Sequence, residues 1–177
     1  MAILDGWTAM ISQTASLVLF PALMAFAASS DLLTMTISNR VSLALMAGFG
    51  IMAALTGMNL TDIGMHFAAA AVVLVAAFIC FSFGWIGGGD AKLAAATALW
   101  LGFPHLIEYL LAASIFGGVL TLLIIGFRRF PLPSFLARQV WLDRLHRPDA
   151  GVPYGIALAL AALVVYPHTV WMKAVAG

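Results

Sequence analysis

Apolar residues run along most of this 177-residue chain and are interrupted by short clusters of polar residues, glycine or proline. The apolar runs lie at about 9–30, 40–57, 65–83, 91–103, 106–127 and 152–171. Because about 20 apolar residues cross a hydrocarbon core of about 30 Å, these runs predict an all-α membrane protein, a polytopic bundle of about six transmembrane helices. The fourth run is short for a full crossing, so we expect a buried helix that starts below the membrane surface or that its neighbours shield from lipid.

Composition supports a membrane protein and excludes several other classes. Hydrophobic residues make up 64% of the chain and charged residues 8%, unlike a soluble globular protein. A net charge of +1 gives no basic surface for nucleic acid. The one cysteine, Cys80, cannot form an intrachain disulfide, and the histidines lack the spacing of metal ligands. We therefore predict a single integral-membrane domain, residues 1–177, with no metal and no cofactor.

The basic residues predict the orientation of the chain, because lysine and arginine in short loops stay on the cytoplasmic side. With six alternating spans, only Lys173 falls on the opposite side from the other basic residues, which are Arg40, Lys92, Arg128, Arg129, Arg138, Arg144 and Arg147. We predict that the loops after the first, third and fifth spans face the cytoplasm and that both termini are non-cytoplasmic.

Two acidic residues fall at this same predicted surface. Asp31 follows the first apolar run, and Asp90 precedes the fourth. Two carboxylates at one depth in a water-poor site are sufficient for aspartyl hydrolysis, in which the ionised group takes a proton from water and the protonated group polarises the scissile carbonyl. Repulsion between them makes such a pair share one proton. The topology therefore predicts Asp31 and Asp90 as a catalytic pair.

Each aspartate also has a simpler explanation. Asp31 can mark the point where the chain leaves the membrane, and Asp90 can be the N-cap of the helix "AKLAAATALW". The glycines before Asp90 favour more than a cap, because a cap needs one short polar residue, whereas three glycines leave a backbone that another backbone can approach closely. We interpret residues 87–89 as the place where an extended peptide substrate is held.

The segments around both aspartates resemble a known family. "GGGDAKL", residues 87–93, has the form of the GxGD signature of intramembrane aspartyl proteases, and Asp-Ala-Lys-Leu is similar to its prepilin peptidase version. "DLLTMTISNRVSLAL", residues 31–45, resembles the first-aspartate motif of those enzymes, with Ile-Ser-Asn at 37–39 where the family has an Ile-Pro-Asn-like triplet. "GVPYGIALAL", residues 151–160, resembles the opening of the family's last helix.

The resemblance implies an aspartic endopeptidase that removes the leader of type IV or Flp-type prepilins or pseudopilins at the cytoplasmic face of the bacterial inner membrane. Asp31 and Asp90 would be catalytic. Lys92 would tune Asp90 electrostatically or, the favoured alternative, extend to the lipid headgroups. The short first loop and the absence of a cysteine pair are similar to the compact Flp/Tad form, without a methyltransferase region. The predicted supporting residues are Gly87, Gly88, Gly89, Lys92 and Asn39.

The predicted inner loop, residues 128–150, carries most of the positive charge. If Ser134 is a helix N-cap, apolar residues gather on one side of the following helix and charged residues cover much of the rest. The apolar positions are Leu136, Val140, Trp141 and Leu145. We expect an amphipathic helix lying on anionic lipid; receiving the basic leader of a prepilin is the less favoured alternative, because like charges repel.

Two other classes of function compete with this interpretation. A non-enzymatic scaffold or a small proton-coupled transporter would use the acids as surface residues or as a relay, but transport sites lie near the bilayer midplane at a repeat interface, and no repeat is evident. A GxGD protease that cuts transmembrane helices is the other alternative. The early Asp31 motif with Asn39 favours the prepilin type.

Overall fold

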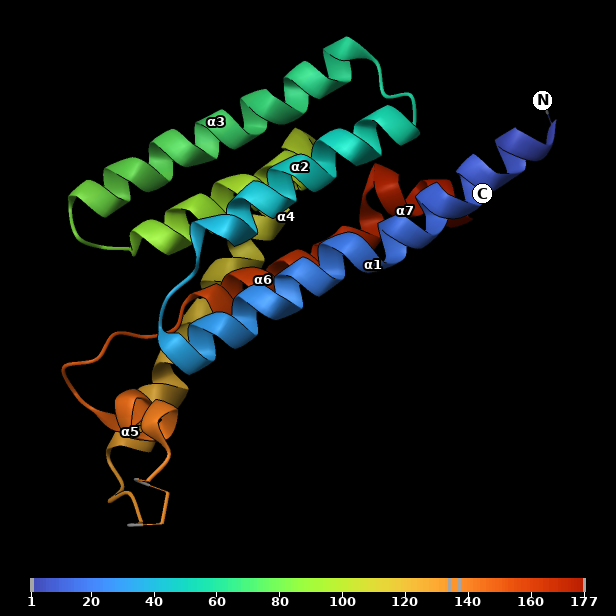
Figure 1. The fold of residues 1–177 in the computed structure, drawn as a ribbon. Helices are drawn as coiled ribbons and strands as arrows, with labels where there is room; N and C mark the ends of the chain where they lie inside the picture. The colour runs from blue at the N-terminus through green and yellow to red at the C-terminus, as the bar shows by residue number, and fades with distance from the viewer. Residues whose placement is uncertain (1, 134, 137, 177) are drawn as a thin grey trace.

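The computed structural model describes residues 2–133, 135, 136 and 138–176. Across these residues the secondary structure is helical, with no strand, which confirms the all-α prediction (Figure 1). The elements are α1 (Ala2–Thr34), α2 (Asn39–Leu55), α3 (Leu60–Ser82), α4 (Gly88–Arg128), α5 (Val140–His146), α6 (Gly155–Val165), a 3-10 turn η1 (Tyr166–His168) and α7 (Val170–Ala176).

Three helical segments of the described chain are long and apolar enough to cross a membrane. They are the Met10–Thr34 part of α1, the whole of α3 and the whole of α4. Two shorter apolar helical segments, Asn39–Leu55 and Gly155–His168, accompany them. The length and apolar composition of these helices support a membrane protein, while the number of six spans and the non-cytoplasmic termini stay predictions.

Helix α4 combines the fourth and fifth apolar runs and is broken between them. Gly102 has φ 66° and ψ 178°, a backbone conformation that a residue with a side chain rarely adopts. Pro104 follows, and proline lacks the N–H that a continuous helix would use. The two halves of α4 run in different directions in Figure 1. Every residue from 93 to 102 is buried, which confirms that neighbouring helices shield the fourth run.

An aromatic cluster around Trp100 holds α4 against α1, α2 and α7. The Trp100 ring lies 5.1 Å from Phe20, 6.2 Å from Phe49 and 5.4 Å from Trp171, measured between ring centroids. Its indole N–H donates to the Leu45 carbonyl at 2.9 Å. Asp31 lies 11 residues after Phe20, and Asp90 lies 10 residues before Trp100, which at 1.5 Å per residue is about 15 Å along each helix. Both aspartates therefore lie at a similar distance from the cluster along their helices.

Helix α5 is shorter than the amphipathic helix expected from Ser134. It begins at Val140, with Gln139 at the N-cap position, and ends at His146. Ser134 itself lies outside the described residues. In Figure 1, α5 lies beside the end of α4, on the side of the molecule where α1 ends. Its contact with lipid stays a prediction.

Candidate active site

Asp31 lies in the last turn of α1 and is 5% exposed. The helix ends because Met35 adopts a left-handed conformation, φ 54°, while its N–H donates to the Asp31 carbonyl at 2.7 Å. The Asp31 side chain faces the start of α6, where the Gly155 N–H donates to Oδ2 at 2.7 Å. This N–H belongs to the first residue of a helix and has no acceptor within that helix, so the carboxylate satisfies it.

Asp90 is the third residue of α4 and is half-buried. The N-cap position belongs to Gly87, with φ −74° and ψ 147°, so the alternative explanation of Asp90 as the N-cap is wrong. The carboxylate lies close to Gly87: a Cβ added at Gly87 would be 2.9 Å from Asp90 Oδ2. A side chain at position 87 would therefore displace the carboxylate.

Ile37 lies beside both Gly89, which precedes Asp90, and Gly155, whose N–H donates to Asp31. The Ile37 side chain packs between these two helix starts. A Cβ added at Gly89 would lie 3.2 Å from Ile37 Cβ, and one added at Gly155 would lie 2.7 Å from Ile37 Cδ1 and 2.8 Å from Asp31 Oδ2. The absence of side chains at Gly89 and Gly155 allows this close packing.

The glycine segment 87–89 contacts the chain itself. The space beside Gly88 is taken by the Phe81 ring, 3.4 Å from an added Cβ, and the space beside Gly89 by Ile37. Close packing against Phe81 and Ile37 is thus sufficient to explain why residues 88 and 89 are glycines. Contact between this segment and a substrate stays a prediction.

Lys92 contacts Asn39, and both are exposed. The Lys92 ammonium donates to Asn39 Oδ1 at 2.9 Å, which joins the first turn of α4 to the first residue of α2. Both residues line one end of a cavity of about 520 Å³ between α2, α3 and α4, whose other lining residues are almost all apolar, such as Leu43, Phe67 and Leu74. Neither predicted role of Lys92 included this contact.

No group of three or more histidine, cysteine, aspartate or glutamate side chains that could hold a metal ion occurs in the described part of the chain. The chemistry available at the two helix starts is that of the carboxylates and the backbone amides beside them.

Comparison with protein families shows the family of the chain. The model of the type IV leader peptidase family matches residues 18–122, more than half of the chain. The chain belongs to the type IV leader peptidase family. No curated protein and no solved structure matches it.

Membership of this family confirms the resemblance to prepilin peptidases. It identifies the chain as a protease of the prepilin peptidase type and implies a prepilin substrate. The matched region contains both aspartates and the glycine segment, and it ends before α6. The contacts that Gly155 makes with Asp31 therefore come from outside the region on which the family match rests.

The sequence analysis assigned no role to Tyr154, which precedes Gly155. Its hydroxyl donates to the Ala113 carbonyl in the second half of α4 at 3.3 Å. The ring fills the space beside Gly117, where an added Cβ would overlap the hydroxyl and the ring carbons. The motif "GVPYGIALAL" was the signal for these residues, but a motif does not say which residues of α4 the tyrosine contacts.

Proposed function

We propose that this type IV leader peptidase is an aspartic endopeptidase in which Asp31 and Asp90 are the catalytic residues. Its substrate would be a type IV or Flp-type prepilin or pseudopilin, cleaved at the cytoplasmic face of the bacterial inner membrane. The observation that carries the proposal is the packing of Ile37 beside both Gly89, next to Asp90, and Gly155, whose N–H donates to the Asp31 carboxylate at 2.7 Å.

The proposed reaction needs one proton shared by the two carboxyl groups. The ionised carboxylate takes a proton from a water molecule, and the water oxygen adds to the scissile carbonyl carbon. The neutral carboxyl group donates its proton to the carbonyl oxygen. The tetrahedral intermediate then collapses: the carboxylate that gave up its proton takes one back from a hydroxyl of the intermediate, the other carboxyl group protonates the amine, and the C–N bond breaks. The contacts of Asp31 and Asp90 with helix starts would hold them in position for these proton transfers.

Basic residues at this end of the molecule support a cytoplasmic cleavage site. Lys92 follows Asp90 by two residues, and Arg128 ends α4 near α5. Lysine and arginine are retained on the cytoplasmic side of short loops. In a Cys80→Ser background, single cysteines placed at Arg40, Trp85 and Arg138 should react with an impermeant thiol reagent only from the cytoplasmic side. Labelling of positions 40 and 85 from opposite sides of the membrane would exclude a shared catalytic surface.

Cleavage of a prepilin panel tests the activity directly. The purified enzyme, in detergent or in bilayer discs, is incubated with type IV and Flp-type prepilins, and the new termini are located by mass spectrometry. We expect one cut between leader and mature segment in at least one class, and loss of that cut in Asp31→Asn and Asp90→Asn.

Asp62→Asn is the matched control for these substitutions. Asp62 is an exposed aspartate in the first turn of α3 whose Oδ2 accepts from the Asn59 amide at 2.7 Å. The change removes one negative charge in the same way, far from the pair along the helices, so cleavage should persist. Cleavage by Asp31→Asn or Asp90→Asn at the rate of this control would reject the two-aspartate mechanism.

A further inference from the structure

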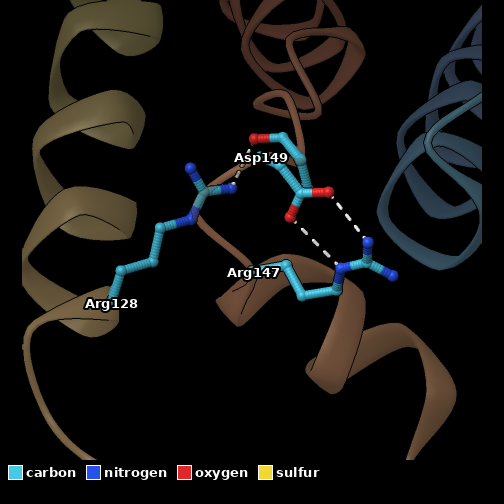
Figure 2. A network of polar contacts seen from close by, with 4 residues as sticks. Arg128, Arg147 and Asp149 are labelled. Carbon is cyan, nitrogen blue, oxygen red and sulfur yellow. Dashed lines mark hydrogen bonds and ion pairs between the residues drawn. The ribbon is translucent and has the colours of Figure 1, made fainter.

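Arg128, the last residue of α4, holds the end of α5 and the chain that follows it. Its Nε donates to the Leu145 carbonyl at 2.9 Å, and its Nη2 donates to the Ala150 carbonyl at 2.9 Å and to the Gly151 carbonyl at 2.8 Å. Figure 2 shows the guanidinium reaching from α4 to this part of the chain. These hydrogen bonds have a charged donor, and a planar guanidinium can hold carbonyls from two directions at once.

The segment held by Arg128 leads directly to the candidate active site. We name residues 147–154, between α5 and α6, the α5–α6 connection. Only residues 152–154 separate Gly151, which Arg128 holds, from Gly155, whose N–H donates to Asp31. Pro153 is one of the three and has a fixed φ, so this short piece of chain has little freedom. A displacement at Gly151 is therefore passed on to the Gly155 N–H.

Helix α4 also holds the other end of the connection. Tyr154 donates to the Ala113 carbonyl and packs its ring on Gly117, as described above. The second half of α4 thus contacts the α5–α6 connection at two places, through Arg128 near its end and through Ala113 and Gly117 within it. The position of the Gly155 N–H relative to Asp31 depends on both.

A second arginine in the same region has a different contact. Arg147 donates to both carboxylate oxygens of Asp149, at 3.2 Å from Nε and 2.8 Å from Nη2, as Figure 2 shows. Both side chains are more than half exposed, and their partners lie within the connection itself. An exposed pair of this kind contributes little to stability. The Arg147–Asp149 pair therefore does not join the connection to α4, whereas Arg128 and Tyr154 do.

We propose that Arg128 is a positioning residue for leader cleavage, which holds the α5–α6 connection so that the Gly155 N–H fixes the Asp31 carboxylate. The proposal rests on the proposed function for the role of Asp31 in catalysis, but the positioning of Gly155 can be measured without catalysis. Arg128 contacts neither aspartate, so its effect on cleavage passes through the backbone of the connection.

Kinetics of four enzymes separate the geometry of Arg128 from its charge. Arg128→Gln removes the charge and the forked set of guanidinium N–H donors. Arg128→Lys keeps the charge but offers one ammonium in place of the guanidinium. Arg129→Gln removes one positive charge from the neighbouring exposed residue. Relative to the unchanged enzyme, we expect kcat to fall about tenfold or more in both Arg128 variants, because the loss of one hydrogen bond to a charged group has about this effect. KM should stay within about threefold. Arg129→Gln should keep both constants.

Amide hydrogen exchange of the peptide that contains Gly155 gives the readout that does not need catalysis. Exchange should be faster in both Arg128 variants than in the unchanged enzyme and should be unaltered in Arg129→Gln. Asp31→Ala, which removes the acceptor, should also speed exchange at Gly155 while leaving the Arg128 contacts in place. Membrane insertion of each variant is checked by its extraction and gel-filtration profile.

The outcomes that overturn the proposal differ from those that overturn the proposed function. Unchanged kcat in Arg128→Lys, equal loss of kcat in Arg129→Gln, or unaltered exchange at Gly155 in Arg128→Gln would each overturn the positioning role. If Arg128→Gln does not insert, Arg128→Lys decides the outcome. Faster exchange at Gly155 together with full cleavage by Asp31→Asn would instead reject the catalytic role of Asp31 and leave the effect of Arg128 on Gly155 intact.

Discussion

Gly117→Ala is the substitution that most directly tests whether α4 controls the start of α6. A Cβ at position 117 would overlap the Tyr154 hydroxyl and ring carbons, so the ring must leave its place on α4. The residue after Tyr154 is Gly155, whose N–H donates to Asp31 at 2.7 Å. The added methyl group should therefore lower the stability of the protein and separate Gly155 from the carboxylate.

The two effects have separate magnitudes. Forcing one methyl group into a packed site costs about 1–3 kcal/mol of unfolding free energy. Losing a hydrogen bond between an amide and a carboxylate costs about 1.5–3 kcal/mol, which corresponds to about a 10- to 150-fold lower cleavage rate if that bond positions Asp31 for catalysis. Because the overlap involves the ring carbons as well as the hydroxyl, Tyr154→Phe should not relieve it.

Gly118→Ala is the control, because it makes the same change one residue along the same helix. No atom lies within 4 Å of a Cβ added there. Alanine is favoured over glycine in a helix by about 0.5–1 kcal/mol, so this variant should be as stable as the unchanged protein or more so, with full cleavage. Thermal unfolding in detergent and initial rates on a prepilin measure the two effects.

A double-mutant cycle with Tyr154→Ala then isolates the contact. Removing the ring makes room at position 117, so Gly117→Ala should cost much less in the Tyr154→Ala background than alone. Equal cleavage by Gly117→Ala and Gly118→Ala, or the same cost of Gly117→Ala with and without the ring, would refute the argument that this contact places Gly155.

Three further predictions concern the carboxylates and the packing around them. Asp31→Asn and Asp90→Asn should each abolish prepilin cleavage without loss of insertion, and the double variant should cleave no worse than either, because the two residues act as one unit; an additive loss would contradict this. Gly89→Val should lower cleavage in the same assay, because a Cβ there lies 3.2 Å from Ile37 Cβ, whereas Gly50→Val has no atom within 4 Å of its Cβ and should not; equal rates would show that the Ile37 contact is dispensable. Hydrogen bonds from Arg147 lower the pKa of Asp149 from its ordinary 3.8, so the pair stays ionised above that pH and its small contribution to stability is lost only as the pH falls through the lowered pKa. Asp149→Asn should therefore leave thermal unfolding and cleavage at neutral pH unchanged, and a large loss would show that this pair, and not Arg128, holds the connection.

Several features of the protein could be predicted from local sequence because each depends on neighbouring residues. The long apolar runs predict a helical membrane protein, and the short fourth run predicts a buried helix, which the structure joins to the fifth run in α4 across the break at Gly102. The motifs around Asp31 and Asp90 predicted the family, which the match over residues 18–122 confirms. The start of α5 was predicted too early, because amphipathic spacing does not fix where a short helix begins.

The partners of each site residue were decided by the tertiary structure. The glycines before Asp90 predict a close approach, but only the packed helices show that Ile37 fills the space beside Gly89. The Gly155 N–H reaches Asp31 across 124 residues of sequence, and hydropathy contains no information about such a pairing. Lipid is as apolar as the helix surfaces, so the contacts between membrane helices depend on the shapes of small residues and on individual hydrogen bonds. The sequence by itself therefore determined which residues are available for catalysis, and the packing of α1, α4 and α6 decided which of them meet.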